Sequence, residues 1–181
     1  MRLALASMLI TMLTLVSACD DGGSPAGSEY NGFYQVTLSQ ERASCSDQDA
    51  WTDLDIMEPY FKLAAQSFFG TPIIGWISCT GATEDTCDDE TIDLTGTFVK
   101  KDGAWQQYMT TSSSGGSETT CLLTYRQGIP ALSETGLTIT VTRWEGEITM
   151  EAGEECDTDL VDKYFDQLDC TQMEYLEATK L

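Results

Sequence analysis

The sequence predicts a mainly β domain: an antiparallel meander or barrel of about eight strands, with one C-terminal helix and a final strand, stapled by disulfides. Three observations support this fold class. Apolar and polar residues alternate over many short segments, and turn residues separate these segments at intervals of roughly 8 to 12 residues. An even set of cysteines is also spread along the chain after residue 40.

The clearest strand signals are at residues 31–40 and 137–144. In each segment every second residue is apolar, which is the pattern of a half-buried strand. The apolar positions are Tyr34, Val36, Leu38, Leu137, Ile139 and Val141.

The middle of the chain indicates a hairpin. Residues 91–100 form a strand with Gly96 as a bend or bulge. Asp102 and Gly103 predict a tight turn, and residues 104–112 supply the partner strand. The apolar residues expected on one face of the first strand are Ile92, Leu94 and Phe98.

Two later segments complete the strand pattern before the helix. Residues 118–127 bring Cys121, Leu123 and Tyr125 to one face. Residues 146–152 extend the strand that starts at Leu137, after a break near Gly146.

Residues 58–72 fit two structures. As a helix, the segment would begin at Pro59 and end at Gly70. As a strand, it would turn back at Gly70 into a second strand at 73–79. The spacing of the surrounding strands favours the strand.

The clearest helix covers residues 157–170. Its apolar side chains follow one stripe, and Asp157 or Thr158 would cap its first turn. A final strand at 171–181 follows. The apolar stripe consists of Leu160, Val161, Tyr164, Phe165 and Leu168.

The first residues resemble a lipoprotein signal. Residues 4–16 are apolar and uncharged, but they are fewer than the about 20 residues that span a membrane. A basic start, a short apolar core and a small-residue end are typical of a secretory signal peptide. Val16, Ser17 and Ala18 lead into Cys19, which resembles the bacterial lipobox. The resemblance implies that Cys19 becomes the first mature residue and carries lipid, including palmitate.

These features divide the chain into three parts: a signal peptide at 1–18, the lipidated Cys19 with a flexible polar tether at 19–29, and one β-rich domain at 30–181. The expected location is the bacterial cell envelope, with the lipid in a membrane. The choice between the inner and the outer membrane stays open.

The other cysteines are expected to form disulfides, because the chain is exported. Cys79 and Cys87 flank a short loop and are the best local pair. Cys156 and Cys170 bracket the predicted helix, which would hold them about 20 Å apart, whereas bridged Cα atoms lie within about 7 Å. They would therefore pair elsewhere, with Cys45 and Cys121. The six candidates are Cys45, Cys79, Cys87, Cys121, Cys156 and Cys170.

The amino-acid composition excludes several classes of function. The net charge of −21 makes nucleic-acid binding unfavourable. The chain has no histidine, so Ser-His-Asp and Cys-His nucleophiles and zinc sites with histidine ligands are excluded. We predict no enzyme, no catalytic residue, no cofactor and no metal site. Two acidic clusters suit calcium chemically, but we interpret them as solvated loops: Glu84, Asp85, Asp88, Asp89 and Glu90, and Glu151, Glu154, Glu155, Asp157 and Asp159.

The order of elements, many antiparallel strands followed by a helix and a last strand, resembles lipocalin-like barrels of the calycin group. Gly32, Phe33 and Tyr34 are similar to the G-x-W motif of their first strand, with Tyr34 in place of tryptophan. Arg143 is a further candidate match. The resemblance implies eight strands, a helix and a ninth strand, around a core or a ligand cavity.

Two functions remain in view. The first is a lipid-anchored envelope protein that serves as an interaction or structural module and exposes an apolar patch to a protein partner. The alternative is a lipocalin-like binding protein for a small apolar ligand, with a continuous apolar cavity of roughly 300 Å³ or more. Eight aromatic residues would line such a cavity or fill a core: Phe33, Tyr34, Trp76, Phe98, Trp105, Tyr108, Tyr125 and Trp144.

Overall fold

The structure is a computed structural model that describes residues 24–115 and 119–181. Its elements in these ranges are nine strands, one α-helix and three short 3-10 helices. The strands are β1 (Gly32–Arg42), β2 (Thr52–Asp53), β3 (Tyr60–Phe68), β4 (Thr71–Cys79), β5 (Asp93–Lys101), β6 (Ala104–Ser114), β7 (Thr120–Leu132), β8 (Gly136–Thr149) and β9 (Asp169–Lys180). The helices are η1 (Ser28–Tyr30), η2 (Glu84–Thr86), α1 (Leu160–Tyr164) and η3 (Phe165–Gln167).

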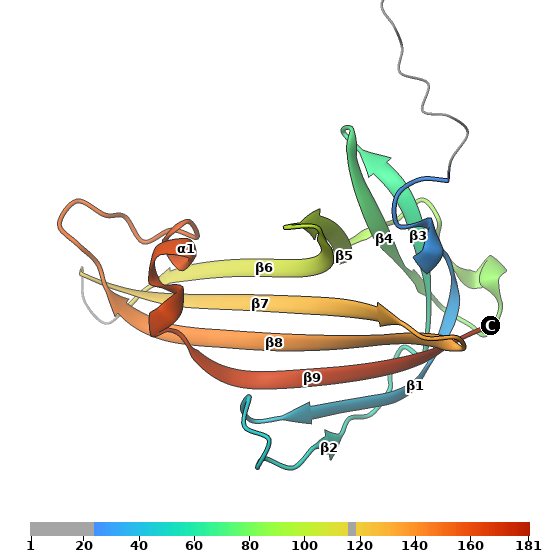
Figure 1. Cartoon of the computed structure of the whole chain (residues 1–181), viewed down its shortest axis with the longest axis horizontal. Helices are drawn as coiled ribbons and strands as arrows, with labels where there is room; N and C mark the ends of the chain where they lie inside the picture. The colour runs from blue at the N-terminus through green and yellow to red at the C-terminus, as the bar shows by residue number, and fades with distance from the viewer. Residues whose placement is uncertain (1–23, 116–118) are drawn as a thin grey trace, which may run out of the picture.

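Eight of the described strands close into an antiparallel barrel (Figure 1). Their order is β1-β3-β4-β5-β6-β7-β8-β9, and β9 pairs back onto β1 from Tyr34↔Lys180 to Arg42↔Met173. The short strand β2 adds to β1 beyond its contact with β3. The predicted fold class is therefore confirmed, including the late helix and the final strand.

The barrel is compatible with a lipocalin-like one, and the order of elements matches the one that the resemblance implied. Eight strands precede α1 in the described chain and one follows it. The last strand is part of the barrel wall, because β9 lies between β8 and β1 and closes the cylinder. Tyr34 is fully buried in the core, whereas Arg143 lies at the surface in an ion pair with Glu145.

Two tight turns form the hairpins at one end of the barrel. Phe69 and Gly70 connect β3 to β4, with φ angles of 48° and 83°, and Asp102 and Gly103 connect β5 to β6, with φ angles of 53° and 84°. Two successive positive φ angles define the type I′ turn, whose twist matches that of the flanking strands. The Asp-Gly hairpin is where the sequence predicted it.

The ambiguous segment is a strand. Tyr60–Phe68 pairs along its whole length with β4, and its alternate residues Phe61 and Leu63 are buried. The barrel decides this outcome, because an extended segment can pair its backbone with β1 along one edge and with β4 along the other.

Three details differ from the predictions. The α-helix covers only Leu160–Tyr164, and Asp157 accepts a hydrogen bond from the backbone N–H of Asp159 without capping the helix. The strand β8 runs without a break through Gly146, where a Cβ would press against η3. Leu94 is 66% exposed, because residues 94–97 of β5 bulge out of the pairing with β4.

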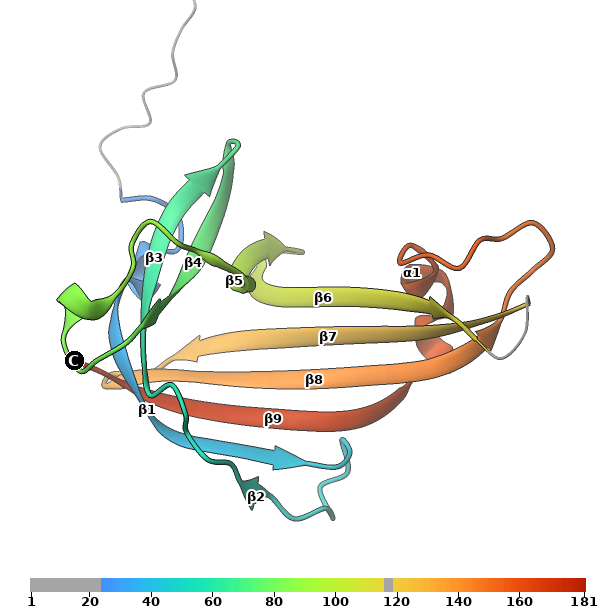
Figure 2. The ribbon, with the colours of Figure 1, turned by 180° about the vertical axis from the view of Figure 1, so that it is seen from behind.

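Two apolar clusters lie on opposite faces of β7 and β8. These strands pair without a register shift from Thr120↔Thr149 to Leu132↔Leu137, so their side chains alternate strictly between the faces. One face carries the barrel core. The other carries a second cluster under α1, at the end of the sheet away from the β3–β4 hairpin (Figure 2).

The two clusters share no member. The barrel core consists of Tyr34, Val36, Phe61, Leu63, Ile74, Phe98, Leu137, Ile139, Val141 and Ala178. The helix cluster consists of Cys121, Leu123, Ile148, Leu160, Val161, Tyr164 and Leu168. A helix on the outer face thus covers the apolar surface that the barrel does not enclose.

Three disulfides staple the described domain. They join Cys45 to Cys170, Cys79 to Cys87 and Cys121 to Cys156. Cys156 and Cys170 therefore do not bridge each other, although the helix between them is shorter than expected. One bridge joins the loop after β1 to the start of β9, and another joins β7 to the loop before α1.

Candidate binding site inside the barrel

A cavity of about 270 Å³ lies inside the barrel, next to the core. The floor comes from β8, where Ile139 and Val141 point inward from the core. Strands β1, β4, β5, β6, β7 and β9 supply the rest, together with Glu58 in the loop before β3. The lining residues are Ser39, Glu58, Trp76, Ser78, Asp93, Thr95, Gly96, Gln107, Arg126, Ile139, Val141, Glu174, Tyr175 and Leu176.

Trp76 and Tyr175 are the aromatic residues of the lining, and Trp76 packs on the core. Its ring stacks on Phe61 with centroids 3.9 Å apart and planes 7° apart. Gly96 in the β5 bulge lies directly over this ring, and a Cβ there would come within 2.7 Å of Trp76 Cγ. The glycine therefore lets the backbone of β5 approach the indole.

An ion pair lies among the polar groups of the lining, which also include the carboxylates of Glu58 and Asp93. Arg126 Nη2 on β7 lies 2.9 Å from Glu174 Oε2 on β9. Nearby, Gln172 Nε2 donates to Glu41 Oε2 at 2.7 Å. The pair is partly solvated, with 28% and 36% of the side chains exposed, so its contribution to stability is small, at about 0 to 1 kcal/mol. Its effect is to place two opposite charges beside an apolar floor.

The wall has a gap that one side chain bridges. Strand β5 pairs with β6 only from Val99 to Lys101, so the first half of β5 makes no ladder with β6. Gln107 on β6 closes this gap by donating to the backbone carbonyl of Thr95. At this place a side-chain hydrogen bond bounds the cavity, whereas most of the barrel wall is held by backbone hydrogen bonds between strands.

This lining fits a small molecule with both an apolar and a polar part. Two aromatic residues and several aliphatic side chains supply apolar surface, and one guanidinium, three carboxylates and several hydroxyls supply polar groups. The continuous apolar cavity that the sequence predicted is not what the described barrel contains. Because Arg126 and Glu174 are 48 positions apart in the chain, no local sequence signal indicates their pairing.

Six of the eight predicted aromatics belong to the two clusters or pack against them. Tyr34 and Phe98 lie in the barrel core, with Trp76 and Trp105 packed against it. Tyr125 and Trp144 pack against the helix cluster, where they stack at 5.6 Å.

Phe33 stacks on Tyr60. Tyr108 is 48% exposed on the outer surface. Only Trp76 among the eight predicted aromatics lines the cavity. Cys19, the predicted lipidation site, lies outside the described residues.

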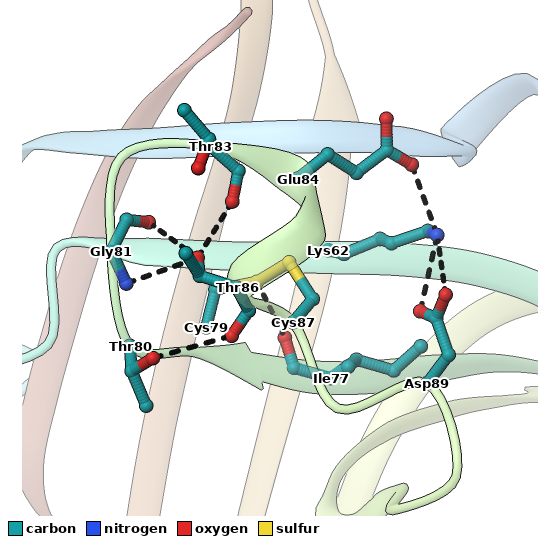
Figure 3. The surroundings of a disulfide bond; sticks show 10 residues. All are labelled: Lys62, Ile77, Cys79, Thr80, Gly81, Thr83, Glu84, Thr86, Cys87 and Asp89. Carbon is teal, nitrogen blue, oxygen red and sulfur yellow. Dashed lines mark hydrogen bonds and ion pairs between the residues drawn. A yellow bond between two sulfur atoms is a disulfide. The ribbon is translucent and has the colours of Figure 1, made fainter.

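In each acidic cluster, two carboxylates pair with one lysine. Lys62 Nζ lies 2.9 Å from Glu84 and 3.1 Å from Asp89 (Figure 3), and both hydrogen bonds raise the pKa of Lys62. The loop that carries these acids is held by the Cys79–Cys87 disulfide. It is also held by the Thr86 hydroxyl, which donates to the Thr83 carbonyl at 2.6 Å. In the second cluster, Lys163 Nζ lies 2.9 Å from Glu151 and 2.7 Å from Glu154.

Residues 24–115 and 119–181 hold no group of three or more side chains placed to bind a metal ion. Within the same ranges, no helix has the length and apolar character needed to cross a bilayer. Comparisons of the chain with protein-family models, with curated proteins and with solved structures found no match. The proposed function therefore rests on the geometry of the barrel.

Proposed function

We propose that this chain is a lipid-anchored binding module of the bacterial cell envelope. Cys19 carries the lipid, and the barrel holds a small ligand that has an apolar portion and a polar portion. The observation that carries the binding proposal is the cavity in which the Arg126–Glu174 ion pair faces Val141 and Trp76. Small-molecule sites commonly combine an apolar lining with a few polar groups that orient the ligand.

The ligand part is tested by native mass spectrometry of the protein extracted from its own membrane. A retained mass is expected on the parent protein. The substitution Arg126→Met keeps the aliphatic stem but removes the guanidinium, and it should abolish the retained mass. Arg143→Met is the matched control, since Arg143 pairs with Arg126 in register but does not line the cavity. An empty parent protein would refute the ligand part and leave the anchor untouched.

The anchor part is tested separately. The Cys19→Ser variant should incorporate no labelled palmitate and should leave the membrane fraction, because two or more acyl chains give stable anchoring and the variant would carry none. A variant that stays labelled and membrane-bound would contradict the lipidation of Cys19.

A further inference from the structure

The tip of the β3–β4 hairpin exposes two neighbouring phenylalanines. Phe69 is 94% exposed and Phe68 is 48% exposed. Their rings meet edge to face with centroids 4.6 Å apart. The β1–β3 pairing ends at Leu63, so the outer part of the hairpin projects beyond the start of β1 (Figure 1). These two rings therefore form a small exposed apolar patch outside the core.

The backbone at the tip makes the choice of phenylalanine unusual. Phe69 has a φ angle of 48°, in the left-handed region that bulky residues rarely adopt. Asparagine, aspartate and glycine are the residues that type I′ turns favour. The turn would thus form more readily with a small polar residue, and the ring of Phe69 serves no packing role in the barrel. Exposure and unfavourable backbone geometry together indicate a contact outside the protein.

The N-terminal segment enters the barrel beside this hairpin. Asn31 Oδ1 accepts a hydrogen bond from the backbone N–H of Ala65 on β3. Gly27 is buried against Ile74 and Trp105, which leave no room for a side chain. Any tether between a lipid on Cys19 and the barrel therefore ends before Gly27.

That tether limits how far the hairpin end can be from an anchored lipid. Cys19 lies eight positions before Gly27, and eight extended residues span at most about 29 Å. The 14-residue strand β8 extends for about 46 Å at the usual rise. A lipid on Cys19 would therefore hold the hairpin end of the barrel near the bilayer and leave the opposite end distant.

The charge at this end differs from that of the whole chain. The end is formed by residues 24–32, 66–72, 100–104, 131–136 and 179–181. These residues include three lysines, Lys100, Lys101 and Lys180, and three acids, Glu29, Asp102 and Glu134. Their side chains sum to zero, in a chain of net charge −21. The hairpin end therefore has no net negative side-chain charge that would repel a membrane surface.

We propose that Phe68 and Phe69 insert into the interfacial region of the lipid bilayer to which the protein is anchored. The orientation of the hairpin toward that bilayer rests on the proposed lipidation of Cys19. The affinity of the tip for lipid does not, because it depends on burial of the two rings alone. The insertion would give the protein a second, non-covalent membrane contact and a fixed orientation.

The test uses the chain without residues 1–18 and with Cys19→Ser, since every described element and all three disulfides lie in residues 24–181. Its partition into phosphatidylcholine vesicles is measured by flotation. Phe69→Asn should lower the partition coefficient roughly tenfold, the factor expected for partial burial of one aromatic ring. Its thermal unfolding temperature should not fall, because asparagine favours the left-handed conformation.

Met57→Asn is the matched control. Met57 is 90% exposed and lies near Tyr60 and Cys79, at the other end of the same hairpin, so its substitution should leave the partition unchanged. Equal binding of the parent and Phe69→Asn, or binding of neither, would overturn the insertion. A mature protein whose mass shows no lipid on Cys19, but whose tip still partitions, would refute the anchor and not the insertion.

Discussion

At the scale of single residues, Glu154 shows how the acidic surface is organised. Its carboxylate accepts hydrogen bonds from Lys163 Nζ, from the Tyr164 hydroxyl and from the backbone N–H of Glu151, each at 2.7 Å. These donors, with Lys163 first, lower the pKa of Glu154 from 4.5 to about 2. Hydrogen bonds to the side chains of Glu151 and of Glu154, in that order, raise the pKa of Lys163. Glu154 thereby holds the C-terminal end of α1 to the loop before the helix, in addition to being a surface charge.

This carboxylate predicts an acid-dependent loss of stability. The pKa of Glu154 is lower in the folded protein than its usual value of 4.5, so its contribution is complete above pH 4.5 and is lost as the pH falls toward 2. In urea unfolding at several pH values, Glu154→Gln should therefore lose less free energy of unfolding over this window than the parent. Glu155→Gln, at an exposed neighbouring position, should behave like the parent. Identical pH profiles for Glu154→Gln and the parent would contradict the role of this carboxylate.

At the scale of elements, β7 and β8 are strands with an apolar portion on each face. Leu137, Ile139 and Val141 face the barrel core, whereas Cys121, Leu123 and Ile148 face α1. Alternation along two strands in constant register forces this division. It explains why a short helix suffices, since α1 needs to cover only the outer apolar portion of the two strands.

A pair of neighbouring leucines tests the division. Leu123 is fully buried under α1, and Leu122, on the opposite face, is 42% exposed. Leu123→Ala should lower the free energy of unfolding by about 2 to 5 kcal/mol, because a buried cavity remains. Leu122→Ala should cost less than about 1 kcal/mol. Equal losses in denaturant unfolding would mean that the two faces are not distinguished as described.

At the scale of the whole molecule, the barrel depends on contacts between distant parts of the chain. The strand β9 closes the cylinder against β1, and the Cys45–Cys170 disulfide, which joins residues 125 positions apart, fixes this junction. The Cys79–Cys87 disulfide closes a loop with a separation of only 8. A covalent link restricts the unfolded chain more when the loop it closes is longer.

The disulfides should therefore contribute unequally. Replacing Cys45 and Cys170 by alanine should cost up to about 5 kcal/mol, and replacing Cys79 and Cys87 up to about 2.5 kcal/mol, on the loop-entropy relation. The measurement is urea unfolding of each double variant under non-reducing conditions. An equal or reversed order would show that closure of the β1–β9 junction does not depend on the long-range bridge.

The sequence by itself determined the local features of this protein. Alternating residues located Tyr34 and Val36 in β1 and Ile139 and Val141 in β8, and Asp102 with Gly103 marked a hairpin turn. These signals are readable because strand alternation and turn geometry depend on residues a few positions apart. Part of the cavity floor was therefore predictable, although the polar lining of the cavity was not.

Only the tertiary structure decided which of these features meet. The Arg126–Glu174 pair, the bridge between Cys45 and Cys170 and the division of β8 between two faces all depend on strand register across the barrel. The length of α1 was decided in the same way, by the area of β7 and β8 left for it to cover. Register and closure are set by packing between segments far apart in the chain, and no short stretch of sequence carries that information.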